Sequence, residues 1–113
     1  MSLPIVHHPA YVAPMPAGHR FPMGKFGRLF AHLLEQRMIT PDQVHVPEPA
    51  PPEWLVLAHA PDYVAAVLAQ SLDEAAVRRI GLPITAAVAA RSRAANGGTI
   101  LTARLALEHG LAC

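Results

Sequence analysis

The longest stretch of this 113-residue chain without proline is also the one best suited to a long helix. Twelve prolines are spread over the sequence up to Pro83, and the longest run without one is 84–113. Proline removes a backbone donor and breaks a helix interior, so its absence from this run favours a long helix there. Thr85 is a suitable N-cap and Gly110 a suitable stop, and the sequence therefore predicts one helix over 86–109.

The predicted helix has one wide arc suited to burial. Opposite its polar side, a helical wheel gathers small and aliphatic residues: Val88, Ala95, Gly98, Leu101, Thr102, Leu105 and Ala106. Gly97 and Gly98 each cost about 1 kcal/mol relative to alanine inside a helix, which indicates close packing on a sheet. Residues 111–113 then form an apolar run that predicts the start of a buried strand, as in half of a β-α-β unit.

The upstream sequence predicts short elements separated by proline. We expect a first strand over 3–7, an irregular loop over 10–22, an amphipathic helix over 24–37 and a second strand over 44–46. A stiff proline connector and three short helices follow, at 53–57, 61–68 and 72–79, the last with a capping box of Ser71 and Glu74. The expected fold class is α/β, mostly helical, with two or three short parallel strands.

The composition argues against several classes of partner. Hydrophobic residues make up 52% of the chain and charged residues 15%, which is rich for a small free-standing domain and implies a buried partner surface. A net charge of +1 gives no footprint for nucleic acid, and arginines such as Arg91 and Arg93 are expected on solvated helix faces. No apolar run suits a membrane span or a secretory signal, so a cytoplasmic location is expected. The single cysteine fits a reducing compartment.

The chemistry-bearing residues do not form a complete site in the sequence. Seven histidines are present, but their spacing does not favour a self-contained zinc site, and no turn presents a nucleophile. The Gly97–Gly98 pair lies within a helix and therefore cannot cradle a phosphate in the usual way. One suggestive feature remains, the proline-rich loop that carries His19, Arg20 and Phe21.

Four segments in order carry a family pattern: residues 3–11, 21–28, 55–63 and 97–112. They resemble the amino-terminal part of the histone deacetylase superfamily, most closely its class IV type and bacterial relatives. The resemblance implies an arginase-like three-layer α/β/α fold and zinc-dependent hydrolysis of an N-acetyl amide on lysine or a related amine. In such enzymes zinc polarises the acyl oxygen and activates a water, and histidines act as general base and acid.

The resemblance also assigns roles along the chain. It implies that the loop residues His19, Arg20, Phe21 and Pro22 form one wall of the acyl-lysine tunnel, and that Lys25 reaches the pocket floor, where many members carry arginine. The matching residues His59, Asp62 and Tyr63 are expected to be structural. The family's tandem histidines, metal ligands and oxyanion-stabilising tyrosine follow the strand that begins at Leu111.

The expectation is therefore a single incomplete deacetylase-like domain over 1–113, without catalytic or zinc-binding residues and inactive alone. Zinc and an acetylated lysine or amine substrate would belong to the full-length parent. The alternative is a non-catalytic helical interaction module that binds a protein partner or itself. Self-association is expected in either case, because short strands with unpaired edges and apolar faces attract one another.

Overall fold

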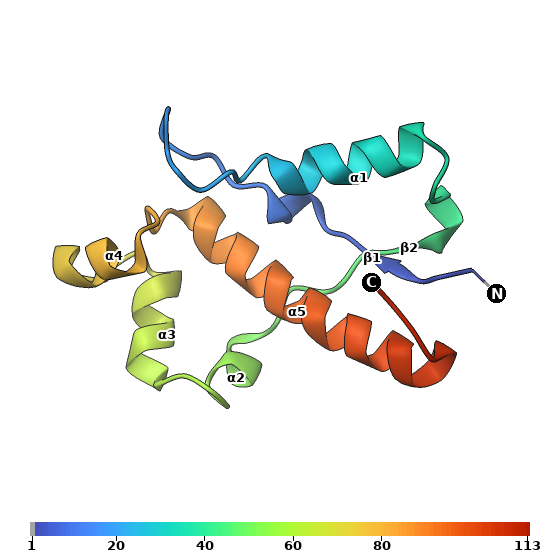
Figure 1. Ribbon diagram of the computed structural model, residues 1–113. Coiled ribbons are helices and arrows are strands. Elements are labelled where there is room, and N and C mark those ends of the chain that lie inside the picture. The colour runs from blue at the N-terminus through green and yellow to red at the C-terminus, as the bar shows by residue number, and fades with distance from the viewer. Residues whose placement is uncertain (1) are drawn as a thin grey trace.

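The computed structural model describes residues 2–113 as a mostly helical chain with a small parallel sheet (Figure 1). Its elements, in order, are β1 (Ile5–Val6), the 3-10 turn η1 (Pro9–Tyr11), α1 (Lys25–Glu35), the 3-10 turn η2 (Pro41–Gln43), β2 (Val44–His45), α2 (Pro52–Leu55), α3 (Pro61–Leu68), α4 (Glu74–Ile80) and α5 (Ala86–His109).

Helix α5 begins and ends where the sequence predicts. The Thr85 side-chain oxygen accepts a hydrogen bond from the Val88 N–H at 3.1 Å, which satisfies one of the free donors of the first turn. Gly110 ends the helix with a φ of 87°, a left-handed conformation that glycine adopts without strain. The prediction of one helix over 86–109 is confirmed.

Strand β1 is hydrogen-bonded along both of its edges. On one edge it pairs in parallel with β2, with Ile5 opposite Val44. On the other edge, the Cys113 N–H donates to the Pro4 carbonyl at 3.0 Å, and the Cys113 carbonyl accepts from the Val6 N–H at 2.6 Å. This pattern is that of a parallel pair, so the backbone at Cys113 continues the sheet beyond β1 (Figure 1).

The prediction of a buried strand over 111–113 is met only by the backbone pairing of Cys113, since no strand is assigned there and the side chains of Leu111 and Cys113 are exposed. Leu111 is 65% exposed and Cys113 is exposed as well.

Gly97 packs against an extended segment and Gly98 against the Tyr11 side chain, so neither glycine packs on a sheet, which corrects the prediction. A Cβ atom on Gly97 would overlap the Glu48 carbonyl oxygen, and one on Gly98 would overlap the Tyr11 hydroxyl. Beside Gly97, the Ala50 N–H donates to the Arg93 carbonyl at 2.9 Å, and Arg93 Nε donates to the Ala50 carbonyl at 2.9 Å. The proline connector therefore crosses α5 at backbone contact distance.

This crossing widens the buried surface of α5 beyond the predicted arc. Ala94 and Gly97 are buried under the connector although neither belongs to that arc, whereas Ala95, Thr102 and Ala106 are only half-buried. Arg93, expected on a solvated face, is half-buried by the same contact. A single amphipathic arc predicts one partner surface, but α5 is packed on two sides.

The start of α4 also differs from its prediction. The N-cap is Asp73, whose carboxylate accepts a hydrogen bond from the Ala76 N–H at 2.7 Å, and not Ser71. Asp73 has the extended backbone that a cap requires, and a carboxylate interacts favourably with the positive end of the helix dipole. Ser71 instead donates its hydroxyl to the Ala66 carbonyl, beyond the end of α3.

The molecule is thin and has a small core. Its principal extents are 47 × 34 × 17 Å, and because packed layers lie about 10 Å apart, the shortest one holds at most two layers. The radius of gyration is 15.7 Å, whereas about 13 Å is expected for a compact domain of this length. Among residues 2–113 no large side chain is fully buried. No helix in this part of the chain is both long and apolar enough to span a membrane.

Candidate functional site

The loop between η1 and α1 is fixed at its base. Ala13 and Met23, near its two ends, are buried together with Val88 in the first turn of α5. Phe21 and Phe26 pack against this cluster from the loop side. The loop is therefore anchored on α5 before it extends outward, although its prolines exclude regular structure.

His19 ties this loop to the turn between α4 and α5. The Phe21 N–H donates to His19 Nδ1 at 3.1 Å, so Nδ1 is an acceptor and the ring hydrogen lies on Nε2. Nε2 then donates to the Gly81 carbonyl at 3.1 Å. Both ring nitrogens are thus engaged, and the ring holds two loops together.

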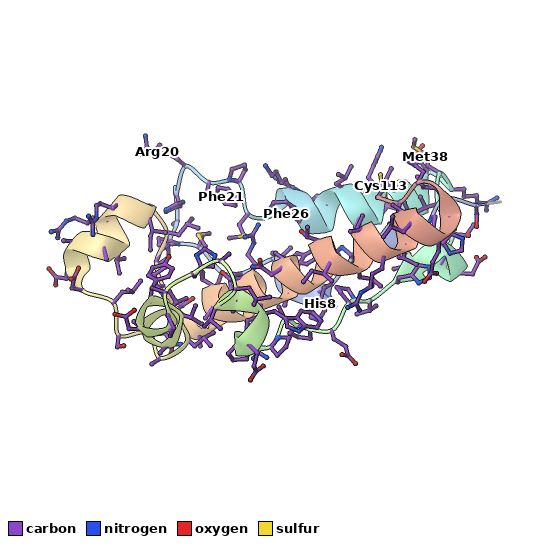
Figure 2. All side chains as sticks on the ribbon, turned by 90° about the horizontal axis from the view of Figure 1, so that it is seen from below. His8, Arg20, Phe21, Phe26, Met38 and Cys113 are labelled. Atoms are coloured by element: carbon purple, nitrogen blue, oxygen red, sulfur yellow. The ribbon has the colours of Figure 1, made fainter. Side chains whose placement is uncertain are left out.

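Four of the predicted tunnel residues line one surface cavity. His19, Arg20, Phe21 and Pro22 form one side of it, the turn from Ile80 to Leu82 forms the other, and the volume is about 450 Å³. Arg20 and Pro22 are exposed, and Figure 2 shows Arg20 pointing away from the body of the molecule. The structure therefore brings these four residues together on one side of this cavity, the rim cavity.

Lys25 lies apart from that cavity, beside a pair of aromatic rings. Its ammonium is 5.5 Å from the Phe21 ring and 5.1 Å from the Phe26 ring. The Arg91 guanidinium faces the same rings at 5.7 and 4.9 Å, and Arg91 Nε donates to the Tyr11 carbonyl at 2.9 Å. Both cations are within reach of a favourable interaction with the ring faces.

Arg91 lies at this ring pair although its sequence position does not predict it. It was expected on a solvated helix face, but it is half-buried and shares the two rings with Lys25. Nothing near it in the sequence signals this, because the loop and α5 meet only in the folded chain. A planar guanidinium is also better suited than an ammonium to stacking and bidentate binding, the property that Lys25 lacks.

A groove continues from these rings along α5. This α5 groove has a volume of about 490 Å³, and its walls carry Tyr11, Phe26 and Arg91 at one end and mostly small residues of α5 along its length. Burial raises the pKa of the Tyr11 phenol, whose oxygen lies against Gly98. The Tyr11 hydroxyl therefore stays protonated at neutral pH.

A second apolar groove lies along α1. This α1 groove, of about 470 Å³, is lined by His7 and by apolar residues that include Ile5, Leu29, Phe30, Leu33, Met38 and Ile39. His7 stacks on Phe30 with ring centroids 3.8 Å apart. Burial, and to a lesser degree the neighbouring charge of His8, lowers the pKa of His7 and favours its neutral form.

The described residues do not provide a metal site. Within residues 2–113, no three His, Cys, Asp or Glu side chains lie close enough together to hold one ion. The zinc that the family resemblance implies therefore has no fitting ligand set in this part of the chain.

Comparison with known proteins gives one long relative and no family. An uncharacterized protein of Picosynechococcus sp. is 55% identical to this chain over 113 residues. The alignment covers 100% of this chain but only 38% of that protein, so the chain spans well under half of the relative's length. No family model matches the sequence.

Proposed function

We propose that this chain is the amino-terminal part of a zinc-dependent deacetylase with an arginase/deacetylase-like three-layer fold. In this proposal it supplies scaffold and one wall of the tunnel for an acetylated lysine or amine, and it is inactive alone. The observation that carries the proposal is the position of β1, which is bonded in parallel to β2 on one edge and to Cys113 on the other.

A strand that is hydrogen-bonded on both edges is an inner strand of its parallel sheet. Parallel sheets occur almost only with helices on both faces, yet residues 2–113 have room for at most two layers. A longer polypeptide of this type would supply the missing layer. The relative, of which this chain matches 38%, is long enough to contain such a layer.

The arrangement of the loop agrees with a role in substrate binding. His19 accepts a hydrogen bond from the Phe21 N–H and donates one to the Gly81 carbonyl. Phe21 lines the rim cavity and also faces the cations Lys25 and Arg91. In the proposal the aromatic ring of Phe21 contacts the apolar stem of an acyl-lysine side chain, and the two cations face its polar end. No catalytic step is assigned to this chain, because the described residues hold no metal site.

The test is a chimera in which this chain replaces the matched part of the Picosynechococcus protein. We expect the purified chimera to contain zinc and to deacetylate an acetyl-lysine peptide, and the 113-residue chain alone to do neither. Phe21→Ala in the chimera should raise KM, with Leu57→Ala, far from the loop, as the matched control. Zinc-dependent turnover by the short chain alone contradicts the claim of inactivity.

If both the chimera and the intact relative bind zinc but leave acetylated lysines and acetylated polyamines untouched, the deacetylase proposal is wrong. The second candidate, a non-catalytic interaction module, is favoured by the open α1 groove, where Leu29 is 60% and Met38 68% exposed. It predicts self-association through that groove.

A further inference from the structure

A third cleft, between α3 and α5, has the composition of a binding site for a small anion. Figure 1 shows α2 and α3 across α5 from α1, and the cleft on that side has a volume of about 180 Å³. None of the residues lining it belongs to the rim cavity or to the α1 and α5 grooves. It is therefore independent of the site described above.

The cleft is lined by both apolar and polar side chains. The apolar ones are aliphatic, among them Val64, which is only 6% exposed, Val67 and Leu68. The polar ones are His59, just before α3, Tyr63 of α3, and Ser92, Arg93 and Asn96 of α5. A small apolar pocket with a few convergent polar groups is the usual form of a small-molecule site.

The polar groups of the cleft are mainly hydrogen-bond donors with capacity to spare. Arg93 uses Nε for the Ala50 carbonyl, and within residues 2–113 its two terminal nitrogens make no hydrogen bond or ion pair. Across the same residues, the side chains of His59 and Tyr63 make no hydrogen bond either, and their rings lie 5.9 Å apart. Asn96 Nδ2 donates to the Ser92 carbonyl at 2.7 Å and retains a second hydrogen.

Within residues 2–113, the lining of the cleft carries a positive charge and no carboxylate. Arg93 is half-buried, and no aspartate or glutamate is among the described residues that line the cleft. A guanidinium presents its terminal N–H groups in a fork that matches the two oxygens of a carboxylate. An anion is therefore the complement of this lining, and an amine is not.

We propose that the cleft binds a small monocarboxylate with a short aliphatic tail. The carboxylate lies on the terminal nitrogens of Arg93, within reach of the Tyr63 hydroxyl, and the tail contacts Val64, Val67 and Leu68. The volume is below that of sites for drug-sized ligands, which sets the size of the tail at a few carbons. The proposal does not depend on the deacetylase function.

The test uses the 113-residue chain and hexanoate as the probe, followed by amide shifts in two-dimensional NMR. We expect saturable shifts confined to α3 and the facing part of α5, with a millimolar Kd, which suits a ligand with so few atoms. The neutral hexanamide should bind about tenfold more weakly, and hexylamine should cause no saturable shift.

Two matched variants separate charge from folding. Asn96→Asp places a carboxylate in the cleft at an exposed position, and should weaken hexanoate binding about tenfold. Ala90→Asp adds the same charge at an exposed position of α5 that does not line the cleft, and should leave the Kd unchanged. Both variants spare the bond from Arg93 to Ala50.

Three results would each overturn the proposal. They are the absence of a saturable shift with hexanoate, equal affinity for hexanoate and hexanamide, and equal effects of Asn96→Asp and Ala90→Asp. Since none of these readouts involves zinc or deacetylation, failure here leaves the proposed function standing, and failure of the chimera leaves this site standing.

Discussion

The two flanks of α5 differ in how closely other segments pack against them. On one flank the proline connector lies against Gly97, with Ala50 and Arg93 joined by two hydrogen bonds, so backbone meets backbone with no space between. On the other flank small side chains leave the α5 groove of about 490 Å³ open. Small residues of α5 thus permit close packing on the flank where a partner segment is present, and leave a groove on the flank where it is not.

The closed flank should be the more sensitive to a single methyl group. Gly97→Ala would gain about 1 kcal/mol of helix propensity but would force apart two backbones that cannot yield locally. We expect a net loss of about 3 kcal/mol in the free energy of unfolding, measured by urea denaturation. Gly24→Ala is the control, because an added Cβ there meets nothing closer than 4.0 Å. Equal stability of the two variants would mean that the connector does not press on α5.

Self-association tests whether the exposed α1 groove is a contact surface. Leu29 and Met38 are 60% and 68% exposed in the α1 groove, so the double substitution Leu29→Lys with Met38→Lys should weaken association about tenfold by sedimentation equilibrium. Leu57→Lys changes a residue that is 85% exposed outside this groove and should have no effect. A wild-type chain that stays monomeric at all concentrations would refute the expected self-association and leave only a different protein as the partner of the interaction module.

Gly98 should be less sensitive to an added methyl group than Gly97, because the atom that this group would meet is the end of a side chain and not backbone. Gly98→Ala would meet the Tyr11 hydroxyl, which makes no hydrogen bond among residues 2–113. We expect a loss of about 1 to 2 kcal/mol, smaller than at Gly97, and partial recovery when Tyr11→Phe is added. A double-mutant cycle measures the coupling, and strictly additive effects would place Tyr11 away from Gly98.

The smallest expected effect is the pH dependence contributed by His7. Its pKa is lowered by burial first and by the charge of His8 second, so the unfolded chain binds this proton more tightly than the folded chain. Stability should therefore decline as the pH falls from the ordinary histidine value through the lowered one. His7→Phe, which preserves the stack on Phe30, should flatten this decline in urea midpoints measured from pH 8 down to about pH 5. An unchanged slope would assign the decline to other groups.

The sequence alone determined the elements with strong local signals. The cap at Thr85 and the stop at Gly110 follow from residue chemistry within a few positions. Composition also predicts a surface in need of a partner, and this stays a prediction.

Only the tertiary structure decided what each element touches. It brought Arg91 onto the rings of Phe21 and Phe26, placed the connector on Gly97, and gathered His59, Tyr63 and Arg93 around one cleft. These contacts join residues that are distant along the chain, and a local pattern reports burial without naming the partner. The capping of α4 by Asp73 and not Ser71 has a different cause, since both are good caps and the backbone path after α3 made the choice.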